Sequence, residues 1–268
     1  MPQRLRLLIR PSLWGLAFLR YLRSWWYMFH LGAIALVTAL SPSTYNRVNR
    51  LTTARYIHAS TWQVLPWFTV LSALISLVII RIVMVTASSY GLSRYALEMV
   101  VRVLVLELIP LSAALFAALR SGMAFDATAL GLARRGLPTA EVNAEALRRL
   151  RRDLVPQLFA NAFSVLSLAM VSSTVVLLLA YLNVYGVSPF GLQDYTRTVG
   201  RVFDPVVTFG FVLKTVLFGL AVAVIPTAAI LELQRYPRRL ASSVQPGALR
   251  LLFVLLLIEG SSLALKYI

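Results

Sequence analysis

The sequence predicts an all-helical integral membrane protein, and three observations support this prediction. Of the 268 residues, 59% are apolar and 13% are charged, whereas soluble domains are about 45–50% apolar and about 25% charged. The mean hydropathy is +0.77. Five apolar stretches are each long enough to cross a bilayer, which takes about 20 helical residues. This composition excludes a soluble globular domain.

Four of these apolar stretches are nearly uninterrupted, and a fifth closes the chain. Backbone N–H and C=O groups in hydrocarbon must pair within their own segment, so each stretch is predicted to be a transmembrane helix. No convincing internal repeat divides them, so residues 61–268 are predicted to form one five-span membrane domain. The predicted spans are Val64 to Thr86, Ala96 to Leu119, Leu154 to Val184, Val206 to Leu231 and Leu249 to Ile268.

Residues 1–60 form a separate N-terminal segment, which two structures could explain. Trp14 to Leu40 is mostly apolar, yet it contains Arg20 and Arg23. As a sixth span, it would place two arginines in lipid, at about 2.5–3.5 kcal/mol each near the bilayer centre. As an interfacial elbow helix, it would place the arginines at the head groups and its tryptophans at the depth that aromatic side chains prefer. We favour the elbow helix.

The net charge of +16 arises from 26 basic and 10 acidic residues. In a soluble protein such an excess would indicate nucleic-acid binding. With five spans and a cytoplasmic N-terminus, however, 19 of the 26 basic residues fall in cytoplasmic segments. This distribution follows the positive-inside rule. The charge therefore predicts an orientation in a membrane and no nucleic-acid partner.

The sequence contains no recognisable catalytic or metal-binding arrangement. It has two histidines and no cysteine, and no carboxylate cluster has the spacing of metal ligands. Residues 131–136 have the glycine spacing of a phosphate-binding loop, but Leu137 and Pro138 follow where Lys and Ser or Thr are required. We therefore expect a chain that is not an enzyme, has no metal or cofactor of its own and does not hydrolyse ATP by itself.

A polar segment at residues 120–153 separates the second and third predicted spans. It contains seven arginines and four acids, with Ala and Leu between them. It is either a solvated loop or a short coupling helix that lies on the membrane face and docks into a cytoplasmic motor subunit. Its unusual length for a bundle favours docking. The candidate coupling residues are Arg134, Arg135, Glu141, Glu145, Arg148 and Arg149.

Ionisable residues within spans are costly in hydrocarbon, and this makes them functional candidates. Glu98 and Arg102 are four residues apart on the second span and can neutralise each other. Glu107 follows on the same span. Lys214 in the fourth span and Glu259 in the fifth are predicted to pair, which would discharge both. Such a pair either joins the helices structurally or takes part in substrate passage, and the sequence leaves both open.

Several motifs from about Arg55 to the C-terminus occur in a characteristic order. They are LELIP at Leu106 to Pro110, ALRSGMA at Ala118 to Ala124, VYGVSP at Val184 to Pro189, LKTVLFG at Leu213 to Gly219, and the late acidic residue Glu259. They resemble, respectively, the R-E-L-G-P motif, the A-G-R-x-G-S-A motif, an outer-loop turn, the L-K-S-x-x-F-G motif and a late acidic residue of the MlaE/YrbE permease family. Members of that family are membrane subunits of ABC transporters that work with MCE-domain proteins in bacterial lipid trafficking.

The chain also departs from this family pattern in specific places. Leu106 stands where the R-E-L-G-P motif has arginine, and Ile109 stands where it has glycine. An arginine-rich stretch around Glu141 to Arg152 replaces the family's acidic coupling segment. The resemblance is therefore that of a divergent member.

The resemblance implies a homodimer of five-span subunits with N-terminal elbow helices, in a bacterial inner membrane. Between the two copies it implies a lipid-sized cavity, with Tyr90, Glu107 and Leu108 near it. The cytoplasmic loop would bind an ABC ATPase subunit, which holds the ATP and Mg, and a periplasmic MCE-domain protein would sit above the dimer. The implied function is the movement of phospholipid or another hydrophobic molecule between the membrane and the MCE protein.

Two other functions remain open at this stage. Ala133 to Gly136, with the sequence ARRG, loosely resembles the Ala-Arg-Gly coupling motif of energy-coupling-factor vitamin importers, although a second such motif is missing. The basic face could also serve a non-transport scaffold that anchors other proteins. An intramembrane enzyme is the weakest hypothesis, because no nucleophile, base and metal arrangement is recognisable.

Overall fold

The computed structural model describes residues 53–120, 142–235 and 247–267, together with Trp25, Trp26, His30, Ala33 and Val37. Over these ranges the chain is helical and contains no strand, as the sequence predicts. The elements are η2 (His58–Trp62), α3 (Leu65–Ser89), α4 (Ser93–Val100), η3 (Val101–Leu108), α6 (Val142–Tyr185), η4 (Pro189–Gly191), α7 (Leu192–Val202), α8 (Pro205–Arg235) and α9 (Ala248–Tyr267). Residues 109–120 continue the helix after η3.

Five helical segments of the described chain are long and apolar enough to cross a membrane, which confirms the five predicted spans. We number them in chain order as the first to the fifth span. They are Thr53–Ser89, Tyr95–Arg120, Leu158–Tyr185, Pro205–Pro226 and Ala248–Leu265.

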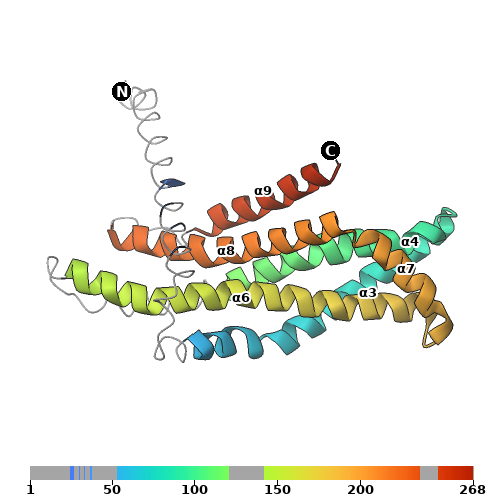
Figure 1. Ribbon diagram of the computed structural model, residues 1–268, viewed down its shortest axis with the longest axis horizontal. Helices are drawn as coiled ribbons and strands as arrows, with labels where there is room; N and C mark the ends of the chain where they lie inside the picture. The colour runs from blue at the N-terminus through green and yellow to red at the C-terminus, as the bar shows by residue number, and fades with distance from the viewer. Residues whose placement is uncertain are drawn as a thin grey trace, which may run out of the picture.

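The helix α6 occupies the centre of the bundle. It runs antiparallel to α8 and packs against both α8 and α3, while α9 packs against α8 (Figure 1). The N-terminus of α6 and the C-terminus of α8 therefore lie at the same end of the bundle, which we call the basic end because Arg148 to Arg152 and Arg235 are found there. The opposite end, where α6 meets α7, is called the far end.

Small side chains allow α6 and α8 to approach closely. The buried face of α6 contains Ala160, Ser164, Ala169, Ser172, Ser173 and Ala180. On α8, Gly219 lies so near α6 that a Cβ atom placed on it would be 2.9 Å from the carbonyl oxygen of Ala162. Helices in lipid associate through such close backbone contacts, because lipid tails are as apolar as the side chains they would replace.

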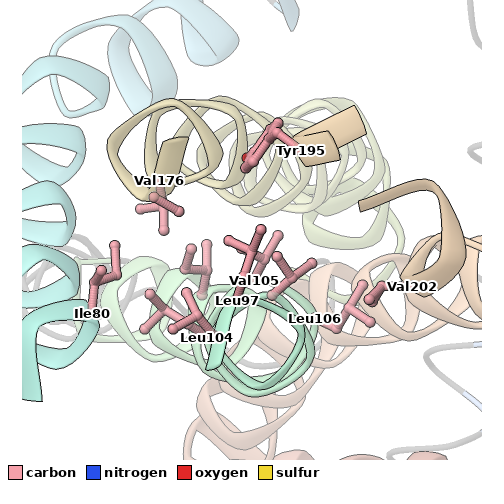
Figure 2. Close-up of a cluster of buried hydrophobic side chains, with 12 residues drawn as sticks. Ile80, Leu97, Leu104, Val105, Leu106, Val176, Tyr195 and Val202 are labelled. Carbon is pink, nitrogen blue, oxygen red and sulfur yellow. The ribbon is translucent and has the colours of Figure 1, made fainter. Parts of the chain in front are cut away.

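The largest apolar core joins the second span to α6 and α7. Figure 2 shows Leu104 and Val105 of η3 facing Val176 of α6, with Tyr195 and Val202 of α7 at the edge of the cluster. A second cluster joins α8 and α9 around Phe218 and Leu255, and a third joins α3 and α6. The outward faces of the helices are also apolar, as expected for a protein surrounded by lipid.

Exposed aromatic side chains bracket the first span. Trp62 and Trp67 lie near its basic end and Tyr90 directly follows its far end, and all three are exposed. Tyr90 follows Trp67 by 23 positions, which corresponds to about 35 Å of helix at 1.5 Å per residue, close to the roughly 30 Å hydrocarbon thickness. Tryptophan and tyrosine favour both membrane–water boundaries, so Trp62 and Trp67 mark the boundary at the basic end and Tyr90 marks the boundary at the far end.

Most of the predicted N-terminal elbow lies outside the described residues. Among its described residues, Trp25 packs its ring edge-to-face on Phe253 of α9, with ring centroids 6.1 Å apart. At least this tryptophan is therefore in contact with the fifth span, whereas the elbow helix itself stays a prediction.

The coupling segment differs from its prediction. We expected a short helix lying on the membrane face, but α6 begins at Val142 and runs without a break through Pro156 into the third span. Its 44 residues extend over about 66 Å, roughly twice the hydrocarbon thickness. The physical reason is local: Ala, Leu, Glu and Arg are strong helix formers, and no glycine interrupts residues 142–157.

The candidate coupling residues fall into two groups, those on α6 and those outside the described residues. Glu145, Arg148 and Arg149 lie on the extension of α6 beyond the membrane-spanning part. Arg134, Arg135 and Glu141 lie outside the described residues. The coupling role of both groups stays a prediction.

The close approach at Gly219 predicts a specific destabilisation. Gly219→Ala should lower the melting temperature of the purified protein in detergent, because the new methyl group meets the Ala162 carbonyl and overpacking costs about 1–3 kcal/mol. Gly210→Ala, on the same helix, is the matched control, since a Cβ there meets nothing within 4 Å. Equal melting temperatures for the two variants would contradict the assigned α6–α8 contact.

Candidate functional site

The most distinctive polar site is a charged triad inside the bundle, formed by Glu107, Lys214 and Glu259. The Lys214 ammonium of α8 donates a hydrogen bond to the Glu107 carboxylate of η3. The same ammonium lies 3.3 Å from Oε2 of Glu259 in α9. The ammonium also donates a hydrogen bond of 3.5 Å to Oε1 of Glu259. The predicted Lys214–Glu259 pair is thus confirmed, and Glu107 joins it as a third member.

The triad lies near the middle of the membrane by two independent measures. Lys214 is nine residues from Pro205, where α8 begins at the far end, which corresponds to about 14 Å of helix. Glu259 is eleven residues from Ala248, where α9 begins, or about 17 Å from the other end. The hydrocarbon core is about 30 Å thick, so both helices bring their charge close to its centre.

A π-helical segment positions Glu107. In η3, the N–H of Ile109 donates to the carbonyl of Leu104, five residues back instead of four. Pro110 follows directly, and in a regular α-helix its ring would clash with the carbonyl four residues earlier. The wider turn relieves this crowding and rotates the preceding side chains. π-Helical turns inside α-helices are frequent at functional sites. Here the π-helical turn changes the direction of the side chains that precede Pro110.

Burial makes the triad energetically demanding. The exposed fractions are 3% for Lys214, 17% for Glu107 and 12% for Glu259. An isolated charge at this depth costs several kcal/mol, which the opposite charges and shared hydrogen bonds offset. The triad therefore joins the second, fourth and fifth spans at one point. It also places hydrogen-bonding groups where a polar part of a membrane-soluble molecule could meet them.

The second predicted ion pair is also present, but elsewhere. Arg102 Nη2 lies 2.8 Å from Glu98 Oε1, one turn away on the second span. Both side chains are partly exposed, and they are nearer the far end than Glu107 is. Arg102 is therefore neutralised locally, and the structure does not bring it into the triad.

The remaining predicted cavity residues are not brought together. Tyr90 ends α3 and is 77% exposed. The next helix begins at Ser93, close to Tyr90, and Glu107 lies 14 residues further along the chain. This separates Glu107 from the start of that helix by about 20 Å along the helix axis. Leu108 adjoins Glu107 and its side chain is exposed on the outside of the subunit. Their position at a cavity between two copies stays a prediction, because the structure describes a single chain.

The sequence reasoning did not identify a tyrosine cluster at the far end. The hydroxyl of Tyr195 on α7 donates a hydrogen bond to the carbonyl of Leu177 on α6, 2.7 Å away. Its ring packs edge-to-face on Tyr181 and Tyr185 of α6. The pKa of Tyr195 is raised to about 12. Burial of the hydroxyl is the larger cause, and the nearby Tyr185 adds to it. The spacing of Tyr181 and Tyr185, four residues apart, was the available signal for this contact.

The fold and the triad define a multi-span helical membrane protein with a charged site at mid-membrane. In the described part of the chain, no group of three or more His, Cys, Asp or Glu residues is arranged to hold a metal ion. The family model described as permease MlaE matches residues 53–263, and the chain belongs to this family. No curated protein and no solved structure shows a significant match.

Removal of the lysine charge should be strongly destabilising. Lys214→Met leaves two buried carboxyl groups without a base, and loss of one partner of a buried ion pair costs about 3–5 kcal/mol. A variant that also carries Glu107→Gln and Glu259→Gln should recover much of the loss, because no charge then remains in the site. Thermal unfolding in detergent measures both. Arg102→Met, at the partly exposed pair, is the control and should cost less, because both of its side chains are much less buried than Lys214.

The Tyr195 hydrogen bond predicts a pH-dependent contribution to stability. At neutral pH, Tyr195→Phe should lower the unfolding free energy by about 0.5–1.5 kcal/mol. The raised pKa of the Tyr195 hydroxyl means that its contribution is complete below pH 10 and is lost as the pH rises through about 12. The difference between wild type and variant should therefore narrow over this range in thermal unfolding. A difference that widens instead would contradict the buried hydroxyl.

Proposed function

We propose that this chain is the transmembrane permease subunit of an ABC transporter that moves phospholipid or another hydrophobic molecule. In this proposal it works between a bacterial inner membrane and a periplasmic MCE-type protein, with energy from a separate ATPase subunit that binds ATP and Mg. Membership of the MlaE permease family over residues 53–263 is the observation that supports this function most directly.

The charged triad suits the passage of an amphipathic molecule. Apolar faces of the spans surround it and are compatible with acyl chains, whereas Glu107, Lys214 and Glu259 offer charged groups at mid-membrane. Binding sites commonly combine an apolar lining with a few polar groups that fix orientation. A lipid head group that crosses the membrane interior would otherwise have no polar partner there.

The basic end suits the attachment of the ATPase. The arginines at residues 148–152 lie on the extension of α6, and this extension continues into the third span as a single helix. A displacement of the extension by the ATPase would therefore reach the membrane interior without an intervening loop. In the proposed homodimer, two such helices would respond to two ATPase subunits.

Co-expression with the transporter's ATPase and MCE subunits tests the proposal. Wild-type protein should co-purify with the ATPase and with lipid detectable by mass spectrometry. Charge reversal at Arg148 and Arg149 should abolish ATPase binding, since both arginines lie on the projecting end of α6. Glu107→Gln should retain the ATPase but reduce lipid transfer in proteoliposomes, because it removes one charge of the triad.

The controls separate transport from a scaffold function. Arg197→Glu, a charge reversal on α7 at the far end, should leave ATPase binding unchanged. A scaffold would tolerate Glu107→Gln and Lys214→Arg while depending on the basic end. A stable complex that contains neither an ATPase nor bound lipid would overturn the proposed function.

A further inference from the structure

An uncharged turn projects from the far end of the bundle. Residues 186–192, with the sequence GVSPFGL, connect α6 to α7 and contain no charged side chain. Val187 is 91% exposed and Phe190 is 92% exposed, and Leu192 is also exposed. Single exposed apolar residues are ordinary on protein surfaces, but here three lie within six positions. We call residues 186–192 the outer turn.

The outer turn lies at the level of the membrane boundary. It begins directly after Tyr185, the last residue of the third span. The neighbouring helix α7 packs against α4, which carries the exposed Tyr95 and begins three residues after the exposed Tyr90. Figure 1 shows α4 and α7 at the same end of the bundle. Exposed tyrosines favour the membrane–water boundary, so the turn is within reach of the acyl chains.

The lipid-facing surface of α6 continues into this turn. Leu178 and Leu182 are exposed one helical turn apart on the third span, where the surrounding medium is hydrocarbon. Val187 follows five residues after Leu182, just beyond the end of α6 at Tyr185. Because the turn adjoins a surface that already contacts lipid, the bilayer is the occupant that fits it without any further assumption.

The polar side of α7 complements this arrangement. The helix buries Tyr195 and Val202 against the core, so its apolar side is already covered by protein. Arg197 and Arg201, four residues apart, are exposed on it. Basic side chains at a membrane surface interact favourably with lipid phosphates.

We propose that the outer turn is a membrane anchor that inserts Val187 and Phe190 into the acyl-chain region of the leaflet at the far end, with Arg197 and Arg201 at the level of the phosphates. The anchor fixes the N-terminal end of α7 in the bilayer surface. Since α7 packs on the core of the second span through Tyr195 and Val202, it also fixes the depth of that core. The anchor does not depend on what the protein transports.

Site-directed spin labelling tests the anchor, and the absence of cysteine from the chain makes single labels straightforward. Phe190→Cys and Thr196→Cys would be labelled with a nitroxide in the full chain and reconstituted in nanodiscs of phosphatidylethanolamine and phosphatidylglycerol. Thr196 is the matched control because it is exposed on the polar side of α7. The ratio of collision with oxygen to collision with a water-soluble nickel chelate should be several-fold higher at position 190 than at position 196.

Two results would overturn the anchor. A ratio at position 190 equal to or below that at position 196 would place the turn in water. Exclusion of both reagents at position 190 would place the turn against protein, either a second copy or a partner. Val187→Cys provides a second, independent label in the same turn, so that the test does not depend on whether the Phe190 variant folds.

Discussion

A lysine ammonium in the middle of the hydrocarbon requires neutralisation, and the arrangement of three helices follows from that requirement. Lys214 is almost completely buried and contacts carboxyl groups from two other helices. Neither acid is close to it in sequence, so the contact exists only when the second, fourth and fifth spans converge at one depth. In lipid, where burial of apolar surface gives helices no preference for one another, such polar contacts and close packing select the arrangement.

The departure from the family motif at Leu106 has a structural consequence. The R-E-L-G-P pattern has a base beside the acid, whereas Leu106 here is buried in the core cluster of the second span. The base that contacts both acids of the triad is Lys214, on a different helix. Isoleucine in place of the motif's glycine, at position 109, likewise adds a fully buried side chain to that core. Apolar side chains at positions 106 and 109 thus pack into the core around η3, where the motif has an arginine and a glycine.

The sequence was sufficient wherever the signal was local. Five spans follow from apolar length, and the Glu98–Arg102 pair follows from four-residue spacing on one helix. Glu107 could not be assigned to Lys214, because their contact depends on a π-helical segment and on the packing of distant spans. The extension of α6 was missed for a different reason: the charged residues before Leu154 end the apolar stretch, but strong helix formers continue the helix through them.

The helix α6 connects the two ends of the molecule. At the basic end it extends beyond the membrane-spanning part, and at the far end its Tyr181 and Tyr185 contact Tyr195 of α7. Tyr195 and Val202 of α7 in turn belong to the same core as Val101, Leu104 and Val105 of η3, the segment that holds Glu107. The helix α6 therefore contacts the core around η3 in two ways, directly through Val176 and through α7, which packs on the same core. If α7 is held at the membrane surface, its contacts with this core also hold η3, and with it Glu107, at a fixed depth in the bilayer.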